Sequence, residues 1–194
     1  KMLLESTSSR ASLWIFGYGS LIWNPGFAYA ESRKAWAQGW KRRMWQGNAN
    51  YRGDEKLPDR VATMVESRRS AASGVAFRVD GADAIDAALA HLNEREIEQG
   101  YAYKFVRVTV DDDGSSLLAL TCIALPTNDF FLGRAPSSEM ALQIGTARGK
   151  AGPNYEYVLK LAEHVRALFP TDDDPHLFGL ERKVREILRS TVAQ

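Results

Sequence analysis

The sequence predicts an α+β fold in which a curved antiparallel or mixed sheet closes into a small β-barrel flanked by helices. Three observations predict it. Short β-type runs fill the first two-thirds of the chain, helical periodicity fills the last third, and 194 residues, 45% of them hydrophobic, suffice for one well-buried core. Two packed subdomains, divided near residues 126–137, are the alternative arrangement.

The first element is an apolar run, residues 13–16, which has the character of a buried strand and breaks at two glycines. Gly17 and Gly19 flank Tyr18, and glycine permits backbone angles and close approaches that a side chain would block. Successive backbone N–H groups in such a loop form a concave donor site for an anionic group. A tight turn between two core strands is the alternative interpretation.

The next strands are predicted from alternation along the chain. Residues 35–45 alternate aromatic, small and basic side chains, which indicates strands or a bent strand pair with its three tryptophans in the core. Residues 46–58 are rich in Asn, Gly and charge, and predict a long loop of the kind that often carries function. Two short β-type runs, 60–65 and 73–79, are separated by a polar turn at 66–71 and predict a hairpin.

The first convincing helix is residues 83–96, where apolar side chains recur at helical spacing and Asp80 or Asp83 is available as the N-terminal cap. This helix ends in an acidic cluster, residues 94–98. The negative end of the helix dipole disfavours carboxylates there, which raises the pKa of one that is also buried and improves it as a base. A solvated run of charge is the alternative interpretation.

The rest of the chain forms one more strand pair and then turns helical. Strands are predicted at residues 101–110 and 116–125, joined by a turn that contains glycine. Three helices follow at residues 137–147, 153–168 and 174–188, and the last of them carries an apolar stripe on one face.

The charge balance and the single cysteine narrow the function. The chain has 25 basic and 24 acidic residues, so its formal net charge of +1 gives no electrostatic reason to expect nucleic acid or a membrane surface as a partner. Cys122 cannot form an internal disulfide, and no secretory or bilayer-spanning pattern is present. We expect a cytoplasmic protein with a flexible tail, residues 1–12, and a single domain, residues 13–190, that binds a small neutral or zwitterionic molecule.

Several common catalytic arrangements are missing from the sequence. His91, His164 and His176 share no ligand spacing with each other or with Cys122, so we expect them to be structural or surface residues. Ser20 lacks obvious His and Asp partners and the trailing glycine of a nucleophile elbow, which disfavours a serine hydrolase. Neither a Walker phosphate loop nor a three-glycine dinucleotide fingerprint is present.

A series of short motifs runs through the chain in a fixed order. Its members are Phe16-Gly17-Tyr18-Gly19-Ser20-Leu21-Ile22-Trp23, Arg42-Arg43-Met44-Trp45-Gln46-Gly47, Tyr51-Arg52-Gly53, Arg60-Val61, Gly74-Val75-Ala76, Leu92-Asn93 with Arg95-Glu96, Gly100-Tyr101, Leu132-Gly133-Arg134-Ala135-Pro136 and Gly152-Pro153-Asn154-Tyr155-Glu156-Tyr157. One motif alone would be weak evidence. The ordered series, from about Trp14 to about Leu188, closely resembles the ChaC-type, glutathione-specific γ-glutamylcyclotransferases.

The resemblance implies a γ-glutamylcyclotransferase-like fold and an enzyme that converts glutathione to 5-oxoproline and cysteinylglycine without a metal or organic cofactor. It implies that Glu96 is the general acid/base and that Tyr157 lies in the same pocket. The loop that it implies for binding the γ-glutamyl group consists of Ile15, Phe16, Gly17, Tyr18, Gly19, Ser20 and Leu21. The family commonly has two glycines before the tyrosine where this chain has Gln99 and Gly100, a departure that makes Glu94 and Glu98 competitors for the base.

The cyclisation predicts two kinds of contact. The α-amine of the γ-glutamyl group attacks its own γ-carbonyl, so a carboxylate must take a proton and return one to the leaving nitrogen. Arg42, Arg43, Arg52 and Arg60 are candidates for the glycine carboxylate, with Arg52 and Arg60 favoured. Activity on other γ-glutamyl amines or amino acids is the alternative, and a non-catalytic γ-glutamyl-binding module is a further one. A monomer is favoured.

Overall fold

Five strands form a closed barrel in the computed structural model, which describes residues 11–49 and 51–192. The strands are β1 (Ser12–Gly17), β2 (Glu31–Gln46), β3 (Val61–Asp80), β4 (Tyr101–Val110) and β5 (Ser116–Ala124), in the spatial order β1, β3, β2, β4, β5. Neighbours pair antiparallel except β1 and β5, which pair in parallel at Ile15 and Leu120 and close the barrel. The predicted tail, residues 1–12, lies outside the described residues except for its last two, and Ser12 already belongs to β1.

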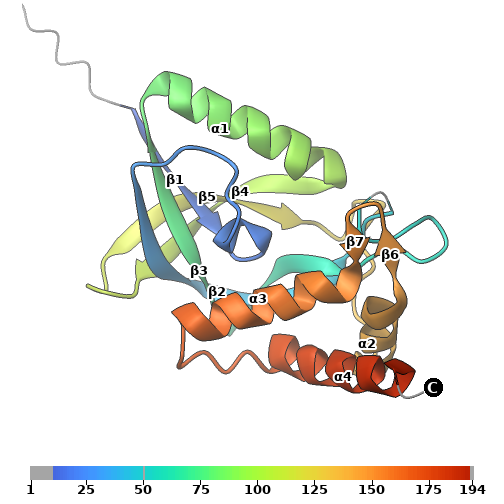
Figure 1. The fold of residues 1–194 in the computed structure, drawn as a ribbon. Coiled ribbons are helices and arrows are strands. Elements are labelled where there is room, and N and C mark those ends of the chain that lie inside the picture. Colours follow the sequence, from blue (N-terminus) through green and yellow to red (C-terminus); the bar gives the residue numbers. More distant parts are fainter. Residues whose placement is uncertain (1–10, 50, 193–194) are drawn as a thin grey trace, which may run out of the picture.

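Helices cover two sides of the barrel (Figure 1). The first helix, α1, connects β3 to β4 on one side, whereas α3 and α4 lie together on the opposite side. The helices are α1 (Ala82–Arg95), α2 (Ser137–Thr146), α3 (Asn154–Leu168) and α4 (Pro175–Val192), with short 3-10 turns η1 (Ser20–Ile22) and η2 (Ile97–Gln99) and a two-stranded ribbon of β6 (Arg148–Gly149) and β7 (Gly152–Pro153). The predicted α+β barrel flanked by helices is therefore confirmed.

The predicted turn at residues 66–71 is wrong, because β3 runs through it without interruption. In the pairing of β2 with β3, Gln38 lies opposite Ala71 and the next pair is Trp40 opposite Glu66. Between these two pairs, β2 advances by two residues and β3 by five. The extra residues of β3 form a bulge at this step, which increases the local bend. Polar, mostly exposed side chains occupy a bulge for the same reason that they occupy a turn, so composition alone does not separate the two.

The predicted side-chain cap of α1 is also wrong. The N-cap residue is Gly81, with φ of 94°, and no side chain caps the helix. Asp80 instead forms an ion pair with Arg78, and Asp83 lies within the first turn. Glycine is needed at this position because φ is positive, a conformation that other residues rarely adopt.

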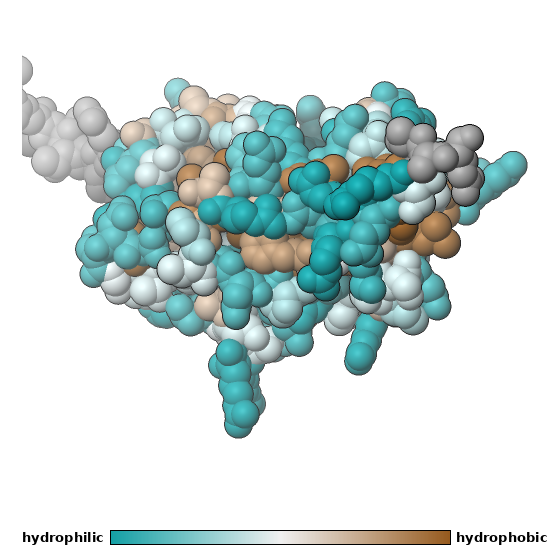
Figure 2. Space-filling view, turned by 60° about the horizontal axis from the view of Figure 1, so that its bottom comes forward, coloured by the Kyte–Doolittle hydropathy of each residue, from teal (hydrophilic) through white to brown (hydrophobic). Residues whose placement is uncertain are grey.

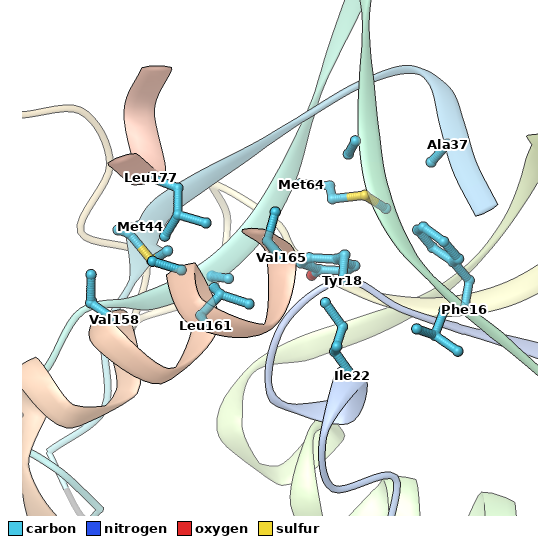
Figure 3. Close-up of a cluster of buried hydrophobic side chains, with 14 of the residues drawn as sticks. Phe16, Tyr18, Ile22, Ala37, Met44, Met64, Val158, Leu161, Val165 and Leu177 are labelled. Carbon is cyan, nitrogen blue, oxygen red and sulfur yellow. The ribbon is translucent and has the colours of Figure 1, made fainter. Parts of the chain in front are cut away.

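Two apolar clusters hold the helices against the barrel. In the larger cluster Phe16, Tyr18 and Met64 from the barrel side face Val158 and Leu161 of α3 (Figure 3). The smaller cluster joins the barrel to α1, and its buried members are Ile15, Leu21, Val79, Ala88, Leu92 and Cys122. The segment that follows β1 contributes to both clusters and is therefore fixed from two sides. The three tryptophans of β2, which we expected in the core, are only partly buried.

The side of the molecule on which α3 and α4 lie is largely hydrophilic, with hydrophobic residues gathered in a central band (Figure 2). Among the described residues, no helix has the length and apolar character needed to cross a membrane.

Candidate active site

A pocket of about 500 Å³ lies beside the loop that follows β1. The predicted site residues that line it are Tyr18, Gly19, Ser20, Leu21, Arg52, Glu96 and Tyr157. Three further predicted residues, Ile15, Phe16 and Gly17, are buried behind the loop and do not line it. The pocket is therefore lined by the second half of the predicted loop, and the role of the loop in binding stays a prediction.

Both glycines of this loop are required by close approach. A Cβ on Gly17 would lie 2.5 Å from Cβ of Leu21, and a Cβ on Gly19 would lie 2.9 Å from the hydroxyl oxygen of Tyr157. Neither glycine has a positive φ. Gly19 is the N-cap of η1, and the first N–H groups of a helix have no partner within the helix. The loop can therefore present backbone N–H groups of Ser20 and Leu21 to an anion.

Arg42 supports the loop from inside the protein. Its guanidinium is 1% exposed and donates through Nε to the Tyr18 carbonyl at 2.9 Å, through Nη2 to the Ser73 carbonyl at 2.6 Å, and through Nη1 to Asp174 at 3.0 Å. These partners assign Arg42 to the scaffold. Arg43 lines a separate surface cavity and also lies outside the pocket.

Arg95, the last residue of α1, joins that helix to the loop. Its Nη2 donates to Ser20 Oγ at 2.7 Å, its Nη1 donates to the Asn24 carbonyl at 2.5 Å, and its Nε lies 3.0 Å from Oε1 of Glu96. The Ser20 hydroxyl thus accepts a hydrogen bond from a cation, which disfavours a role as nucleophile.

Glu96 is the buried member of the acidic cluster. Its side chain is 15% exposed and lines the pocket. Burial raises the pKa of Glu96 from the ordinary 4.5 to about 7, and the Arg95 guanidinium acts against this rise. Glu94 also lines the pocket but is exposed, and Glu98 is exposed and does not line it. The geometry therefore favours Glu96 over both competitors as a base.

Three tyrosine hydroxyls lie close to Glu96, and two of them donate their proton to the backbone. Tyr18 donates to the Cys122 carbonyl at 2.6 Å, and Tyr101 donates to the Ala62 carbonyl at 2.7 Å. The Tyr157 hydroxyl instead accepts the Ala62 N–H at 3.2 Å, so its own proton stays available. Burial raises the pKa of Tyr157 well above its ordinary value, which keeps this proton on the hydroxyl.

The two favoured arginines have different positions. Arg52 lines the pocket, and its Nη1 donates to the Pro153 carbonyl at 2.9 Å and to Glu156 at 3.1 Å. The Arg60 guanidinium is buried outside the pocket, where it donates to Gln143 at 2.7 Å and to the carbonyls of Met44 and Gly133. This placement argues against the expected contact of Arg60 with a substrate carboxylate.

Several pocket residues had no signal in the sequence. Asp59 lines the pocket although the sequence gives it no feature beyond that of an acidic residue at the end of a polar loop, and burial raises its pKa to about 7. His91 lines the pocket as well, whereas His176 accepts the Met44 N–H through Nε2 and is structural as expected. Tyr101 could have been suspected, because it follows the acidic cluster within a few residues.

The departure at Gln99 falls in a short turn beside the pocket. The backbone here forms η2, and Gly100 ends it with φ of 88°. Gln99 itself lines the pocket, where its side-chain oxygen accepts from Asn48 Nδ2 at 2.5 Å and its carbonyl accepts from Gln46 Nε2 at 2.8 Å. These bonds tie the end of α1 to the long loop on the other side of the pocket. In the described part of the chain, no group of three or more His, Cys, Asp or Glu side chains is arranged to hold a metal ion.

Comparison with known proteins gives consistent matches along nearly the whole chain. Residues 13–187 match the family described as ChaC-like protein. Glutathione-specific gamma-glutamylcyclotransferase 1 of Danio rerio is 41% identical over 95% of this chain and 95% of its own, and its Homo sapiens counterpart is 41% identical over 91% and 80%. A crystal structure of the γ-glutamyl cyclotransferase specific to glutathione from yeast superposes with a TM-score of 0.81 at 26% identity, over 91% of this chain and 96% of that one.

Proposed function

This chain belongs to the ChaC-like family, and we propose that it is a glutathione-specific γ-glutamylcyclotransferase in which Glu96 is the general acid/base. The reaction releases 5-oxoproline and cysteinylglycine from glutathione. The observation that carries the residue assignment is the largely buried Glu96 carboxyl, which pairs with Arg95 at 3.0 Å and lines the same pocket as the glycine loop.

Glu96 moves the protons of the reaction. It accepts a proton from the α-ammonium of the γ-glutamyl group, and the resulting amine attacks the γ-carbonyl carbon to close the five-membered lactam. Protonated Glu96 then donates to the cysteinyl nitrogen, whose bond to that carbon breaks. The α-nitrogen loses two protons overall and the leaving nitrogen gains two, so Glu96 makes this transfer twice. A pKa near 7 suits a group that must do both near neutral pH.

The loop and Tyr157 bind the substrate in its reactive conformation. Backbone N–H groups of Ser20 and Leu21, next to the Arg95 guanidinium, hold the α-carboxylate, which brings the amine towards the γ-carbonyl. Such positioning lowers the barrier by several kcal/mol and by up to about 7–11 in ideal intramolecular reactions. Tyr157 donates its free proton to the oxygen of the γ-carbonyl as negative charge develops there.

The remaining assignments follow from charge and composition. Arg52 faces the glycine carboxylate at the other end of the pocket. The protein acts as one domain, since a single barrel with its helices carries all the residues that line the pocket, and a monomer is the favoured state. It binds no nucleic acid, since its net charge is +1, and it is cytoplasmic, since its only cysteine, Cys122, is buried and unpaired.

The direct test is to incubate the purified protein with reduced glutathione and to quantify 5-oxoproline and cysteinylglycine by mass spectrometry. We expect both products in equal amounts. Higher kcat/KM for a γ-glutamyl amine or another γ-glutamyl amino acid would favour the general γ-glutamyl alternative. Binding of glutathione without either product would favour the non-catalytic module.

A further inference from the structure

The pocket holds a second buried carboxyl, which the proposed mechanism does not use. Asp59 lines the pocket and is 1% exposed. Its Oδ2 accepts the Arg52 N–H at 3.2 Å, and the Asn48 backbone N–H also stabilises the carboxylate, whereas its Oδ1 has no partner at hydrogen-bond distance among the described residues. A buried acceptor without a partner is unfavourable and uncommon in folded proteins. Oδ1 therefore marks a position that a donor group of a bound molecule would satisfy.

The course of the chain indicates which part of the substrate reaches this carboxyl. Ala62 contacts the Tyr157 and Tyr101 hydroxyls beside the reacting carbonyl, and Asp59 lies three residues earlier, at most about 11 Å away at 3.3–3.6 Å per residue. The cysteinylglycine half of glutathione is two residues long and spans at most about 7 Å on the same scale. Arg52 and Lys150 also line the pocket and offer positive charge to a terminal carboxylate. A Cys–Gly peptide group between the reacting carbonyl and those cations is then within reach of Asp59.

We propose that Asp59 accepts the Cys–Gly peptide N–H of glutathione through Oδ1 and thereby selects the tripeptide over γ-glutamylcysteine. This inference rests on the proposed function. The dipeptide has a carboxylate in place of the Cys–Gly peptide group, so it has no N–H to donate and places negative charge next to an acidic residue. A carboxyl oxygen can accept this bond whether Asp59 is ionised or protonated.

The test combines one substitution with one change in the substrate. Asp59→Asn keeps an oxygen for the Arg52 N–H but replaces the free oxygen with an NH2 group, which cannot accept. The matched substrate is the glutathione analogue with sarcosine in place of glycine, which keeps the terminal carboxylate and replaces the peptide N–H with N–CH3. For the wild-type protein, we expect kcat/KM to be at least ~10-fold higher for glutathione than for the analogue. In Asp59→Asn this preference should be lost, through a higher KM for glutathione at similar kcat.

Asp54→Asn is the control, because Asp54 lies in the same loop, is exposed, and accepts the N–H groups of Lys56 and Leu57 through Oδ1. It carries the same change of charge and should leave both substrates unaffected. If Asp59→Asn lowered kcat/KM equally for glutathione and the analogue, Asp59 would only stabilise the loop that contains it. That result would overturn the inference.

If Asp59→Asn fails to fold, the wild-type comparison decides by itself, and equal kcat/KM for the two peptides overturns the inference. If the wild-type protein forms no 5-oxoproline, the proposed function fails, and calorimetric affinities for the two peptides still test the contact of Asp59. Equal affinities would contradict it, whereas weaker binding of the analogue would support it.

Discussion

The two ends of the pocket are built by different means. At the γ-glutamyl end, Ser20 follows a barrel strand and Glu96 follows a helix, and Arg95 contacts both of them directly. At the end that we assign to cysteinylglycine, Arg52 and Asp59 come from the long loop between β2 and β3. The Arg52 side chain is 23% exposed there, and Asp59 keeps an unpartnered oxygen. The groups assigned to the chemistry are thus fixed by regular elements, and those assigned to substrate selection lie on a loop.

The largest effect should come from removing the base. Glu96→Gln keeps the shape of the side chain and a hydrogen bond to Arg95 but cannot accept a proton. We expect kcat for glutathione to fall by more than ~10²-fold while binding persists. Turnover assays of the variant, with calorimetry for binding, measure both quantities.

The competing glutamates provide the control for this change. Glu94→Gln and Glu98→Gln should keep most of the activity, because both side chains are exposed. If activity were lost only in Glu94→Gln or Glu98→Gln while Glu96→Gln stayed active, the base would be that other glutamate. The contrast between the two ends of the pocket would then not hold.

A smaller effect on activity is expected at the glycine loop that follows β1. In Gly19→Ala the new Cβ would lie 2.9 Å from the Tyr157 hydroxyl, so either the loop or the tyrosine must shift. We expect kcat/KM to fall by about 10- to 100-fold, because small displacements of positioning groups have such effects. The melting temperature should change little, since Gly19 has no positive φ to lose. Parallel loss of stability and activity would instead indicate a purely structural turn.

The pH dependence of kcat/KM tests the role of Glu96 without a mutation. Glu96 must be ionised to accept the first proton, and its pKa is about 7. Below that value, kcat/KM should fall about tenfold per pH unit. A rate that stays constant down to pH 5 would contradict Glu96 as the base.

Stability should fall as pH rises, whereas kcat/KM should increase. The pKa of Glu96 rises from 4.5 to about 7 on folding, so between these values the folded protein holds a proton that the unfolded chain has released. The stability that this group contributes is present below pH 4.5 and is lost as pH rises through about 7. Denaturant unfolding at pH 5 and pH 8 should therefore show a smaller loss of stability for Glu96→Gln than for the wild-type protein.

The smallest effect on activity is expected at the end of the pocket that the long loop between β2 and β3 forms. Arg52→Ala should lower kcat/KM for glutathione by about tenfold and leave γ-glutamylcysteine less affected, because a charge-assisted bond to the glycine carboxylate contributes roughly 1.5–3 kcal/mol. Arg60→Ala is the matched comparison. It should lower the melting temperature without changing the ratio of the two substrates, since the Arg60 guanidinium binds only protein acceptors. A changed ratio in Arg60→Ala would reopen its role at the substrate.

Sequence patterns predicted the regular end of the pocket well. The strand before Gly17 and the helix that ends at Arg95 both follow from the spacing of apolar residues, which is a local property of the chain. The bulge in β3 escaped prediction because Glu66 and its polar neighbours satisfy a turn and an exposed bulge equally well.

The loop end could not be predicted in the same way. Arg52 and Arg60 look alike in the sequence, and only the tertiary structure directs one into the pocket and the other towards Gln143. Asp59 gave no signal, because its burial depends on a loop that returns to Asn48, a contact set by long-range packing. Periodicity carries no information about such contacts.

The contacts of Arg42 also have a consequence for the protein while it is being synthesised. Every residue that lines the pocket has been incorporated once Tyr157 is added, yet the Arg42 guanidinium that holds the Tyr18 carbonyl also needs Asp174, which precedes α4. A nascent chain that ends at Tyr157 thus has every side chain that lines the pocket but lacks the carboxylate that pairs with Arg42 behind the loop. Chains terminated before Asp174 should therefore be inactive on the ribosome or after release, although α4 itself contributes no residue to the pocket.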